Sequence, residues 1–361
     1  MKNYALVMKV SLVSLAGLLV LGCSGDDSSS GDANGSATDG GDDGNDDGGD
    51  DGGDDGGDDG GDDGVDDSND DGPDDGVDDD TGDGGDPIAG YCDLGEAVGH
   101  FDVILEESYS AIDGEVRENL VQMAILTVAA DEAGCQVVKA EFPFCNPPCS
   151  GGDACTENGC VEFPPRVELG TVDITGLEAD VSMEPASDKR YFETDLPHPA
   201  IASGADITLD VDGGEYSGFT MQGAGFSALV ATTGALELAE GAPVDITWEA
   251  EDTGAMVRIE LNIDQHGTSP STLYCNVPDN GEFSVPATVV DALINAGTSG
   301  FPSANIYRQT VDSTNTDTGC VEFRIRARTE VTINVEGHTA CNDSSECPDG
   351  QICNVPIQTC E

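Results

Sequence analysis

Basic residues are scarce in this sequence. Of its 361 residues only 12 are Lys or Arg, against 73 Asp or Glu, and the formal net charge is −61. Residues 87 to 361 alone still carry a charge of −36. Binding to nucleic acid depends on clustered Lys and Arg that neutralise phosphates. The composition therefore excludes nucleic acid as an expected partner.

Motifs of enzymes and metal sites are also missing. The chain has no Cys-x-x-Cys, the usual spacing of zinc ligands and redox dithiols, and no Gly-x-Ser-x-Gly nucleophile motif. One weak site candidate is Asp264 with His266, which leave an expected strand on the same side and enter a Gly-Ser-Pro loop. An Asp-oriented His can act as a base or a metal ligand. A hydrogen-bonded turn is the expected interpretation, so we predict neither a catalytic residue nor a bound cofactor.

Long apolar runs are absent beyond residues 10 to 21, which are too few to span a membrane. Lys2 and Lys9 precede this run, and Gly22 follows it, as in a secretory signal peptide over residues 1 to 22. The stretch Val20-Leu21-Gly22-Cys23 resembles the lipobox of bacterial lipoproteins, with Leu21 a small departure from it. The resemblance implies a lipid on Cys23 that attaches the chain to a membrane. Ser24 after the cysteine implies a place in the bacterial outer membrane, with the protein surface-exposed.

An acidic linker is expected over residues 23 to 88. Residues 24 to 86 hold 27 Asp and no Lys, Arg or Glu. Such a stretch has almost nothing apolar to bury, so we predict that it is disordered. Calcium-binding repeats rich in Gly and Asp also contain apolar positions, which this linker lacks. We therefore expect weak Ca²⁺ association with the linker at most.

Cysteine provides the framework of the remaining chain. Besides Cys23 there are 12, an even number, which in an exported protein predicts up to six disulfides. These candidates are Cys92, Cys135, Cys145, Cys149, Cys155, Cys160, Cys275, Cys320, Cys341, Cys347, Cys353 and Cys360. Outside the two dense clusters, the natural pairs are Cys92 with Cys135, inside one unit, and Cys275 with Cys320, inside another.

Two short segments each contain four cysteines, residues 145 to 164 (the first cysteine module) and residues 339 to 361 (the second cysteine module). Both contain Cys-x-x-Gly-x-x-Cys, at 149 to 155 and at 347 to 353, which indicates an internal repeat. Spacing alone permits three connectivities in each. The modules resemble four-cysteine modules of secreted myxobacterial proteins. That resemblance implies that the first cysteine pairs with the third and the second with the fourth.

Short alternating segments predict a mainly β fold. Ten such segments between residues 167 and 335, separated by Gly, Asn, Asp and Pro, indicate a disulfide-braced β-sandwich over 165 to 338. Within it we expect one helix, at residues 287 to 295, and a strand at 226 to 231. Trp248, the single Trp, alternates with Val244 and Ile246 and is expected in the core rather than on a sugar-stacking surface. Residues 89 to 144 are expected to form a smaller β unit, although 116 to 130 also fit a helix.

The chain resembles a family of myxobacterial cell-surface lipoproteins. The stretches that carry the resemblance are residues 262 to 270, Leu273-Tyr274-Cys275, Asp279-x-Gly281-x-Phe283, residues 300 to 303 and Gly319-Cys320-Val321. It implies location and disulfides but no activity. We therefore expect a non-catalytic surface lipoprotein that binds an extracellular protein or glycan. The alternatives are a hydrolase of extracellular polymer and a structural or protease-inhibitory role of the cysteine modules.

Overall fold

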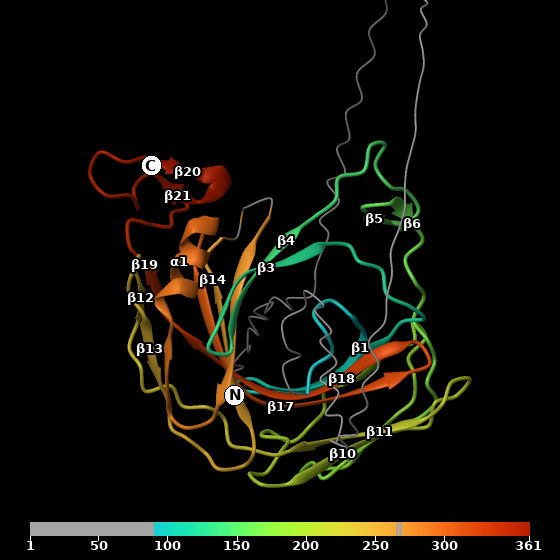
Figure 1. Ribbon diagram of the computed structural model, residues 1–361. Coiled ribbons are helices and arrows are strands. Elements are labelled where there is room, and N and C mark those ends of the chain that lie inside the picture. The colour runs from blue at the N-terminus through green and yellow to red at the C-terminus, as the bar shows by residue number, and fades with distance from the viewer. Residues whose placement is uncertain (1–89, 265, 267–268) are drawn as a thin grey trace, which may run out of the picture. The chain divides into compact units, whose positions relative to one another are not determined.

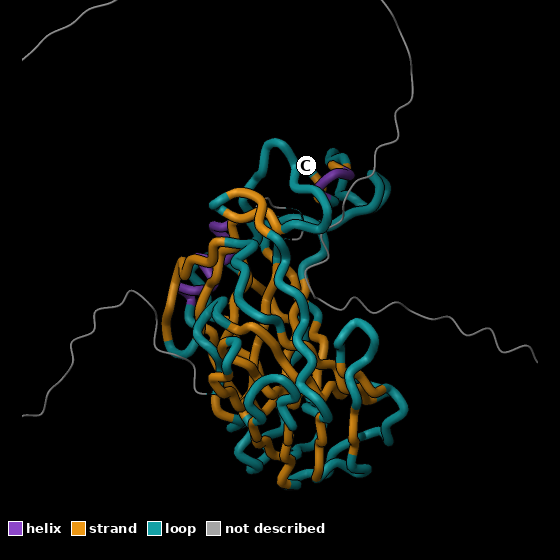
Figure 2. The backbone as a smooth tube through the Cα atoms, turned by 90° about the vertical axis from the view of Figure 1, so that its right-hand side faces the viewer, coloured by secondary structure: helices purple, strands orange, loops and turns teal. Residues whose placement is uncertain are grey.

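The computed structural model describes residues 90–264, 266 and 269–361, in which strands dominate (Figure 2). The predicted signal peptide, Cys23 and almost all of the acidic linker lie outside the described residues. Within the described part of the chain, no helix has the length and apolar character that a membrane crossing requires. The structure confirms the predicted mainly β fold with cysteine-rich modules.

A nine-stranded sheet organises the described residues (Figure 1). All its neighbours are antiparallel except β1 and β18, which are parallel. The strands, in spatial order, are β3 (Ile125–Glu132), β4 (Cys135–Glu141), β15 (Ser271–Pro278), β14 (Met256–Asn262), β17 (Ser303–Thr316), β18 (Gly319–Val331), β1 (Ala97–Leu105), β2 (Ser110–Val116) and β9 (Tyr191–Glu193).

One hydrophobic core lies between this sheet and a second sheet of four strands. Phe101 of β1 and Phe323 of β18 enter it, together with Leu209 of the smaller sheet. Strand β11 contacts both β17 and β18. The four strands, in order, are β11 (Phe219–Ala224), β10 (Asp206–Val211), β7 (Val172–Thr175) and β8 (Val181–Met183).

A second core lies against β14 and β15, under a helix and two strand pairs. The helix α1 (Ala287–Ala296) confirms the helix predicted at residues 287 to 295, begins after Pro286, and buries Val289, Val290 and Leu293. The strand pairs are β12 (Leu236–Leu238) with β19 (Ile333–Val335), and β13 (Val244–Thr247) with β16 (Glu282–Val285). Trp248 is buried in this core, as the sequence indicated.

The expected N-terminal β unit shares the large sheet. Strands β1 to β4 cover most of residues 97 to 141 and pair with β18, β15 and one another. Residues 116 to 130, which also fitted a helix, contain the end of β2 and most of β3. The strand predicted at residues 226 to 231 is wrong, because this segment runs as a loop whose Phe226 fills the first core. The apolar and polar residues of this segment alternate because single side chains, such as Phe226, are buried, and not because the segment pairs in a sheet.

All 12 cysteines of the described chain form disulfides. The two cysteine modules pair first with third and second with fourth, as their resemblance implied. They contain β5 (Ala154–Thr156) with β6 (Gly159–Val161), and β20 (Cys353–Asn354) with β21 (Thr359–Cys360), joined through the 3₁₀ turn η1 (Val355–Ile357).

The predicted pairs of Cys92 with Cys135 and of Cys275 with Cys320 are wrong. The bonds are Cys92–Cys320 and Cys135–Cys275. The reason is the sheet order. Strand β1, which follows Cys92, lies beside β18, and Cys135 of β4 stands directly opposite Cys275 of β15.

Candidate functional site

The predicted site residues Asp264 and His266 follow β14 and lie near Ser299. Asp264 is buried, and its carboxylate accepts a hydrogen bond from the Ser299 hydroxyl. The same hydroxyl accepts a hydrogen bond from the backbone N–H of His266, at 3.1 Å. The ring of His266 is 2.7 Å from the Gln358 side-chain oxygen, in the second cysteine module.

Further contacts show that this region is a junction between the sandwich and the second cysteine module. The backbone N–H of Gly300 donates to the Ile357 carbonyl at 2.9 Å and is 3.4 Å from the Thr359 hydroxyl, and both of these residues belong to the module. The hydrogen bonds of Asp264 and His266 therefore hold a loop and attach a module. This arrangement fits the expected hydrogen-bonded turn better than a catalytic base.

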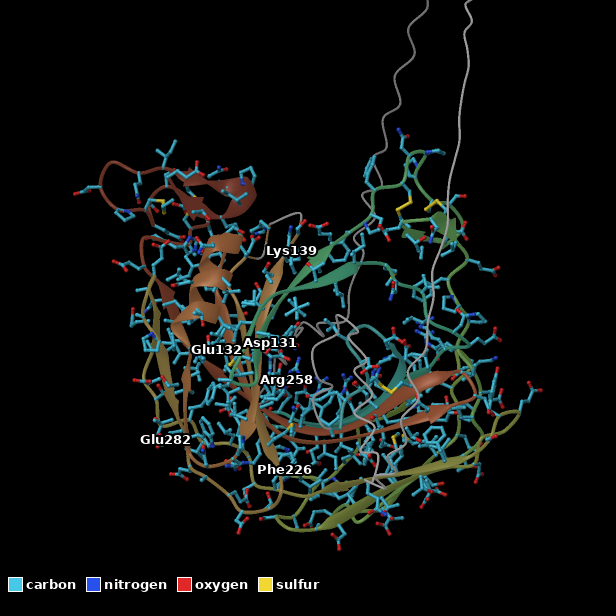
Figure 3. The ribbon with its side chains drawn as sticks, viewed as in Figure 1. Asp131, Glu132, Lys139, Phe226, Arg258 and Glu282 are labelled. Carbon is cyan, nitrogen blue, oxygen red and sulfur yellow. A yellow bond between two sulfur atoms is a disulfide. The ribbon has the colours of Figure 1, made fainter. Side chains whose placement is uncertain are left out.

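A more distinctive feature lies on the solvent side of the nine-stranded sheet. Alternate side chains of a strand point to opposite faces. In β18, Phe323 and Ile325 enter the first core, so the arginines between and after them point away from it. Figure 3 shows Arg258 and the core residue Phe226 on opposite sides of the sheet. We call this surface the arginine face, and it contains Arg258, Arg324, Arg326 and Arg328.

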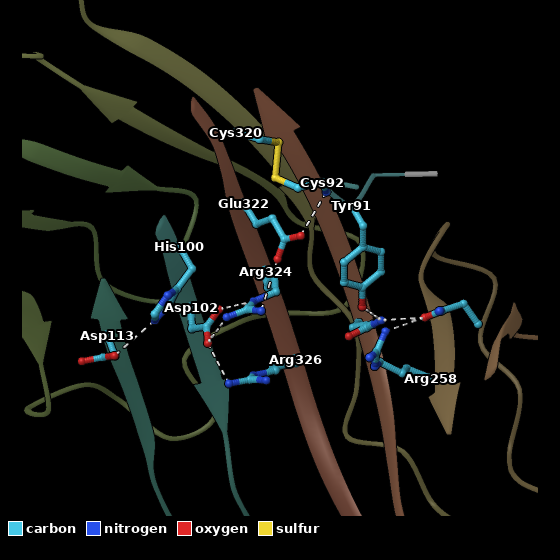
Figure 4. A network of polar contacts seen from close by, with 12 residues as sticks. Tyr91, Cys92, His100, Asp102, Asp113, Arg258, Cys320, Glu322, Arg324 and Arg326 are labelled. Atoms are coloured by element: carbon cyan, nitrogen blue, oxygen red, sulfur yellow. Dashed lines mark hydrogen bonds and ion pairs between the residues drawn. A yellow bond between two sulfur atoms is a disulfide. The ribbon is translucent and has the colours of Figure 1, made fainter. Parts of the chain in front are cut away.

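Each arginine of this face has a carboxylate partner. Asp102 of β1 lies directly opposite Arg324 and is almost fully buried, and it accepts hydrogen bonds from both Arg324 and Arg326 (Figure 4). The N···O distances are 2.6 Å for Arg324–Asp102, 2.7 Å for Arg326–Asp102, 3.2 Å for Arg324–Glu322, 2.7 Å for Arg258–Glu260 and 2.9 Å for Arg328–Glu106. The four cations thus meet four carboxylates, and the face is close to neutral.

Tyrosine rings lie beside the guanidinium groups. Arg258 is 4.4 Å from the ring centre of Tyr274 and 5.2 Å from that of Tyr91. Arg326 is 5.9 Å from the ring centre of Tyr307. Such cation–π contacts are attractive and orient the rings. The face therefore presents planar groups together with many hydrogen-bonding atoms.

Burial and the neighbouring arginine charges shift the pKa values of acidic groups on the arginine face. Burial by itself raises the pKa of Asp102, but the charges of Arg324 and Arg326 outweigh it, so the net pKa lies below the ordinary value. Burial also raises the pKa of Tyr307 well above that of a free phenol, which keeps the ring neutral. At neutral pH the face is therefore an array of ion pairs with neutral hydroxyls.

This array makes stability depend on pH. A carboxyl whose folded pKa is depressed stabilises the fold fully above its unfolded pKa, near 3.9, and loses that contribution as the pH falls. We expect Asp102→Asn to reduce the free energy of unfolding most at neutral pH, with the gap to wild type shrinking below about pH 4. Urea unfolding at a series of pH values checks this. A gap that stays constant from neutral to acidic pH would contradict it.

The arginine face was not predicted from the sequence. The available indication was the alternation of Arg324, Arg326 and Arg328, three of only 12 basic residues, of which the first two lie in the strand predicted at residues 320 to 327 and the third directly follows it. Alternation places them on one face. Their partners Asp102 and Glu106 precede them by 222 residues and could not be assigned from the sequence.

A second candidate surface lies at the start of the first cysteine module. Phe144, the residue before the module, is 89% exposed and borders an open cavity of about 440 Å³. Polar side chains also line the cavity, among them Asn146, Asp153 and Glu157. A bare aromatic ring held beside hydrogen-bonding groups is a feature of recognition surfaces.

Within the described residues, the groupings with metal-ligand spacing consist of cysteines. They are Cys145, Cys149 and Cys160 in the first module, and Cys341, Cys347 and Cys353 in the second. All six are in disulfides, so their sulfurs are not thiolates and do not have the chemistry of a zinc site.

Comparison with family models and with curated proteins finds no match. Among solved structures, a match is the crystal structure of the chicken CNTN1 FN1-FN3 domains, at 7% sequence identity and a TM-score of 0.18. It covers 62% of this chain and 78% of that chain. A similarity at this level carries no argument about fold or function.

Proposed function

We propose that the protein is a non-catalytic lipoprotein of the bacterial outer membrane that presents its β fold for binding outside the cell. The lipobox-like stretch ending at Cys23 and the acidic linker support the location. The arginine face is the single observation that supports binding. It collects four of the ten cations in the described residues on one side of one sheet.

The balance of charge indicates the class of ligand. A polyanion needs unpaired cations, and here each arginine already meets a carboxylate. Side chains of Arg324, Arg326 and Arg328 are nevertheless 23–31% exposed, so their remaining donors face solvent. Paired guanidinium and carboxylate groups beside tyrosine rings suit a neutral, hydroxyl-rich ligand. We therefore propose a neutral extracellular glycan.

The hydrolase alternative gains no support from the geometry around His266. Its ring hydrogen-bonds to Gln358, and the neighbouring Ser299 hydroxyl donates to Asp264 rather than to the ring. A nucleophile activated by a histidine requires the opposite arrangement, with the hydroxyl proton accepted by the ring nitrogen.

A glycan-array screen of residues 78–361, which form one compact unit, tests the proposal. It is run with calcium and with chelator. We expect binding of neutral glycans in both conditions, since the groups with metal-ligand spacing among the described residues lie in the cysteine modules and consist of disulfide cysteines. Arg326→Gln is expected to weaken a hit at least about tenfold, the effect of losing a hydrogen bond to a charged group.

Two further variants locate the binding surface. Lys139→Gln, which removes a cation of β4 paired with Glu141, is the matched control and should leave affinity unchanged. Phe144→Ala should also leave it unchanged. Loss of binding in Phe144→Ala but not in Arg326→Gln would move the site to the first cysteine module. No binding by folded, oxidised protein would contradict the proposal.

A further inference from the structure

The disulfides of the sandwich are nested. Cys92–Cys320 spans a sequence separation of 228 residues and encloses Cys135–Cys275, which spans 140. Cys135–Cys275 in turn encloses both bonds of the first cysteine module. A pull on the two ends of an oxidised chain therefore cannot extend anything between Cys92 and Cys320.

The outer bond lies ahead of the first strand of the described residues. Cys92 precedes β1 in the chain, so tension that arrives from the residues before Cys92 reaches this bond before it reaches any of these strands. Non-covalent contacts hold the same short segment on the arginine face (Figure 4). The Tyr91 ring lies on Arg258, its hydroxyl contacts Gln309, and the Cys92 backbone N–H donates to Glu322 at 3.0 Å.

The strand that receives the bond is central. Cys320 is the second residue of β18, which pairs with β17 from Ala304↔Val331 to Thr316↔Gly319. On its other side β18 pairs with β1 from Ala97 to Leu105. Load delivered to Cys320 therefore enters a strand bonded to neighbours along most of its length, and the strand also contains three arginines of the arginine face.

We infer that this fold is an attachment that carries mechanical tension. Tension that arrives before Cys92 passes through Cys92–Cys320 into β18 and bypasses residues 93–319. A ligand held on β18 is then joined to the preceding chain by a covalent path that does not run through β1 to β4. The inference takes from the proposed function the membrane anchor of the preceding chain and the ligand on β18, and the bypass of residues 93–319 depends on neither.

Single-molecule stretching of residues 78–361, held at both ends, tests the inference. At about 3.4 Å per residue, the oxidised protein should extend on unfolding by roughly 100 Å, because the free residues after Cys320 are mainly those before the second cysteine module, which its own two disulfides close. Cys92→Ala/Cys320→Ala should extend by roughly 400 Å, limited by Cys135–Cys275. The matched control Cys135→Ala/Cys275→Ala should extend by the same length as wild type, because the bond that it lacks lies inside the loop closed by Cys92–Cys320 and is not under tension.

A second measurement uses wild-type protein alone, held at constant force while a thiol is added to reduce its disulfides, and records the extension. The first extension should be the short one, and a much longer step should follow when the loaded outer bond is reduced. A first extension of roughly 400 Å or more in oxidised wild type would overturn the inference. So would a longer extension in Cys135→Ala/Cys275→Ala. Neither measurement involves a ligand, so a failed glycan screen would not affect it.

Discussion

Asp279→Asn is expected to lower the free energy of unfolding by about 3 kcal/mol, the low end of the cost of breaking a buried ion pair, because Arg308 keeps Glu251 as a second partner at 3.1 Å. The Asp279 and Arg308 side chains are 2% and 3% exposed, and Arg308 Nε donates to Asp279 Oδ2 at 2.7 Å. The other Asp279 oxygen accepts from the Trp248 indole at 2.6 Å. Asparagine preserves the volume of the side chain but removes the more buried of the two negative charges, Asp279 and Glu251, that the guanidinium faces.

Urea unfolding of the two proteins at neutral pH measures this loss. Asp131→Asn is the matched control, since Asp131 is exposed and its carboxylate accepts only from the nearby Gln136 in the contacts of the described chain. Its effect should be within about 0.5 kcal/mol, as for most surface substitutions. Equal losses in the two variants would mean that the Arg308 pair does not stabilise the core as its burial indicates.

Loss of the Cys135–Cys275 bond is expected to have an equally large effect. Opening a loop of 140 residues costs about 5 kcal/mol in the loop-entropy model, so Cys135→Ala/Cys275→Ala should lower the unfolding free energy by that order. Both cysteines are also fully buried in the second core, so their truncation removes packing there. Denaturant unfolding under non-reducing conditions measures the loss.

Removing a disulfide of the first cysteine module is the control for removing Cys135–Cys275. Cys145–Cys155 closes a loop of only 10 residues, for which the same model gives about 3 kcal/mol. Neither cysteine belongs to the two cores. Cys145→Ala/Cys155→Ala should therefore loosen the module and shift the main unfolding transition much less. A main transition lowered equally by both double variants would show that the module is part of the cooperative unit.

Much of the fold follows from local patterns. Alternation of apolar and polar residues predicted most strands, including residues 206 to 211, which form β10 over the same residues. Pro286 and Gly297 bracket a helix as expected, because proline suits the start of a helix and glycine its end. Alternation failed at Phe226, where one buried ring in a loop produced the same pattern as a strand.

The candidate site was less accessible to sequence reasoning. Asp264 and His266 were predicted as a weak site because of their residue types. The structure instead places them in a junction, where they contact Ser299 and Gln358. The arginine face needs Asp102 beside Arg324, and these residues come together only because β1 joins the sheet next to β18. Nothing in the sequence around Asp102 or Arg324 indicates that the two residues are neighbours in the sheet.

The sequence by itself determined the acidity, the cysteine framework, the two modules and the period of the strands. These properties depend on composition or on residues a few positions apart, where backbone geometry fixes which side chains share a face. Only the tertiary structure decided which strands are neighbours, and with them the pairs Cys92–Cys320 and Cys135–Cys275 and the arginine face. Sheet pairing joins segments 140 to 228 residues apart, and it is set by how whole faces pack into a common core.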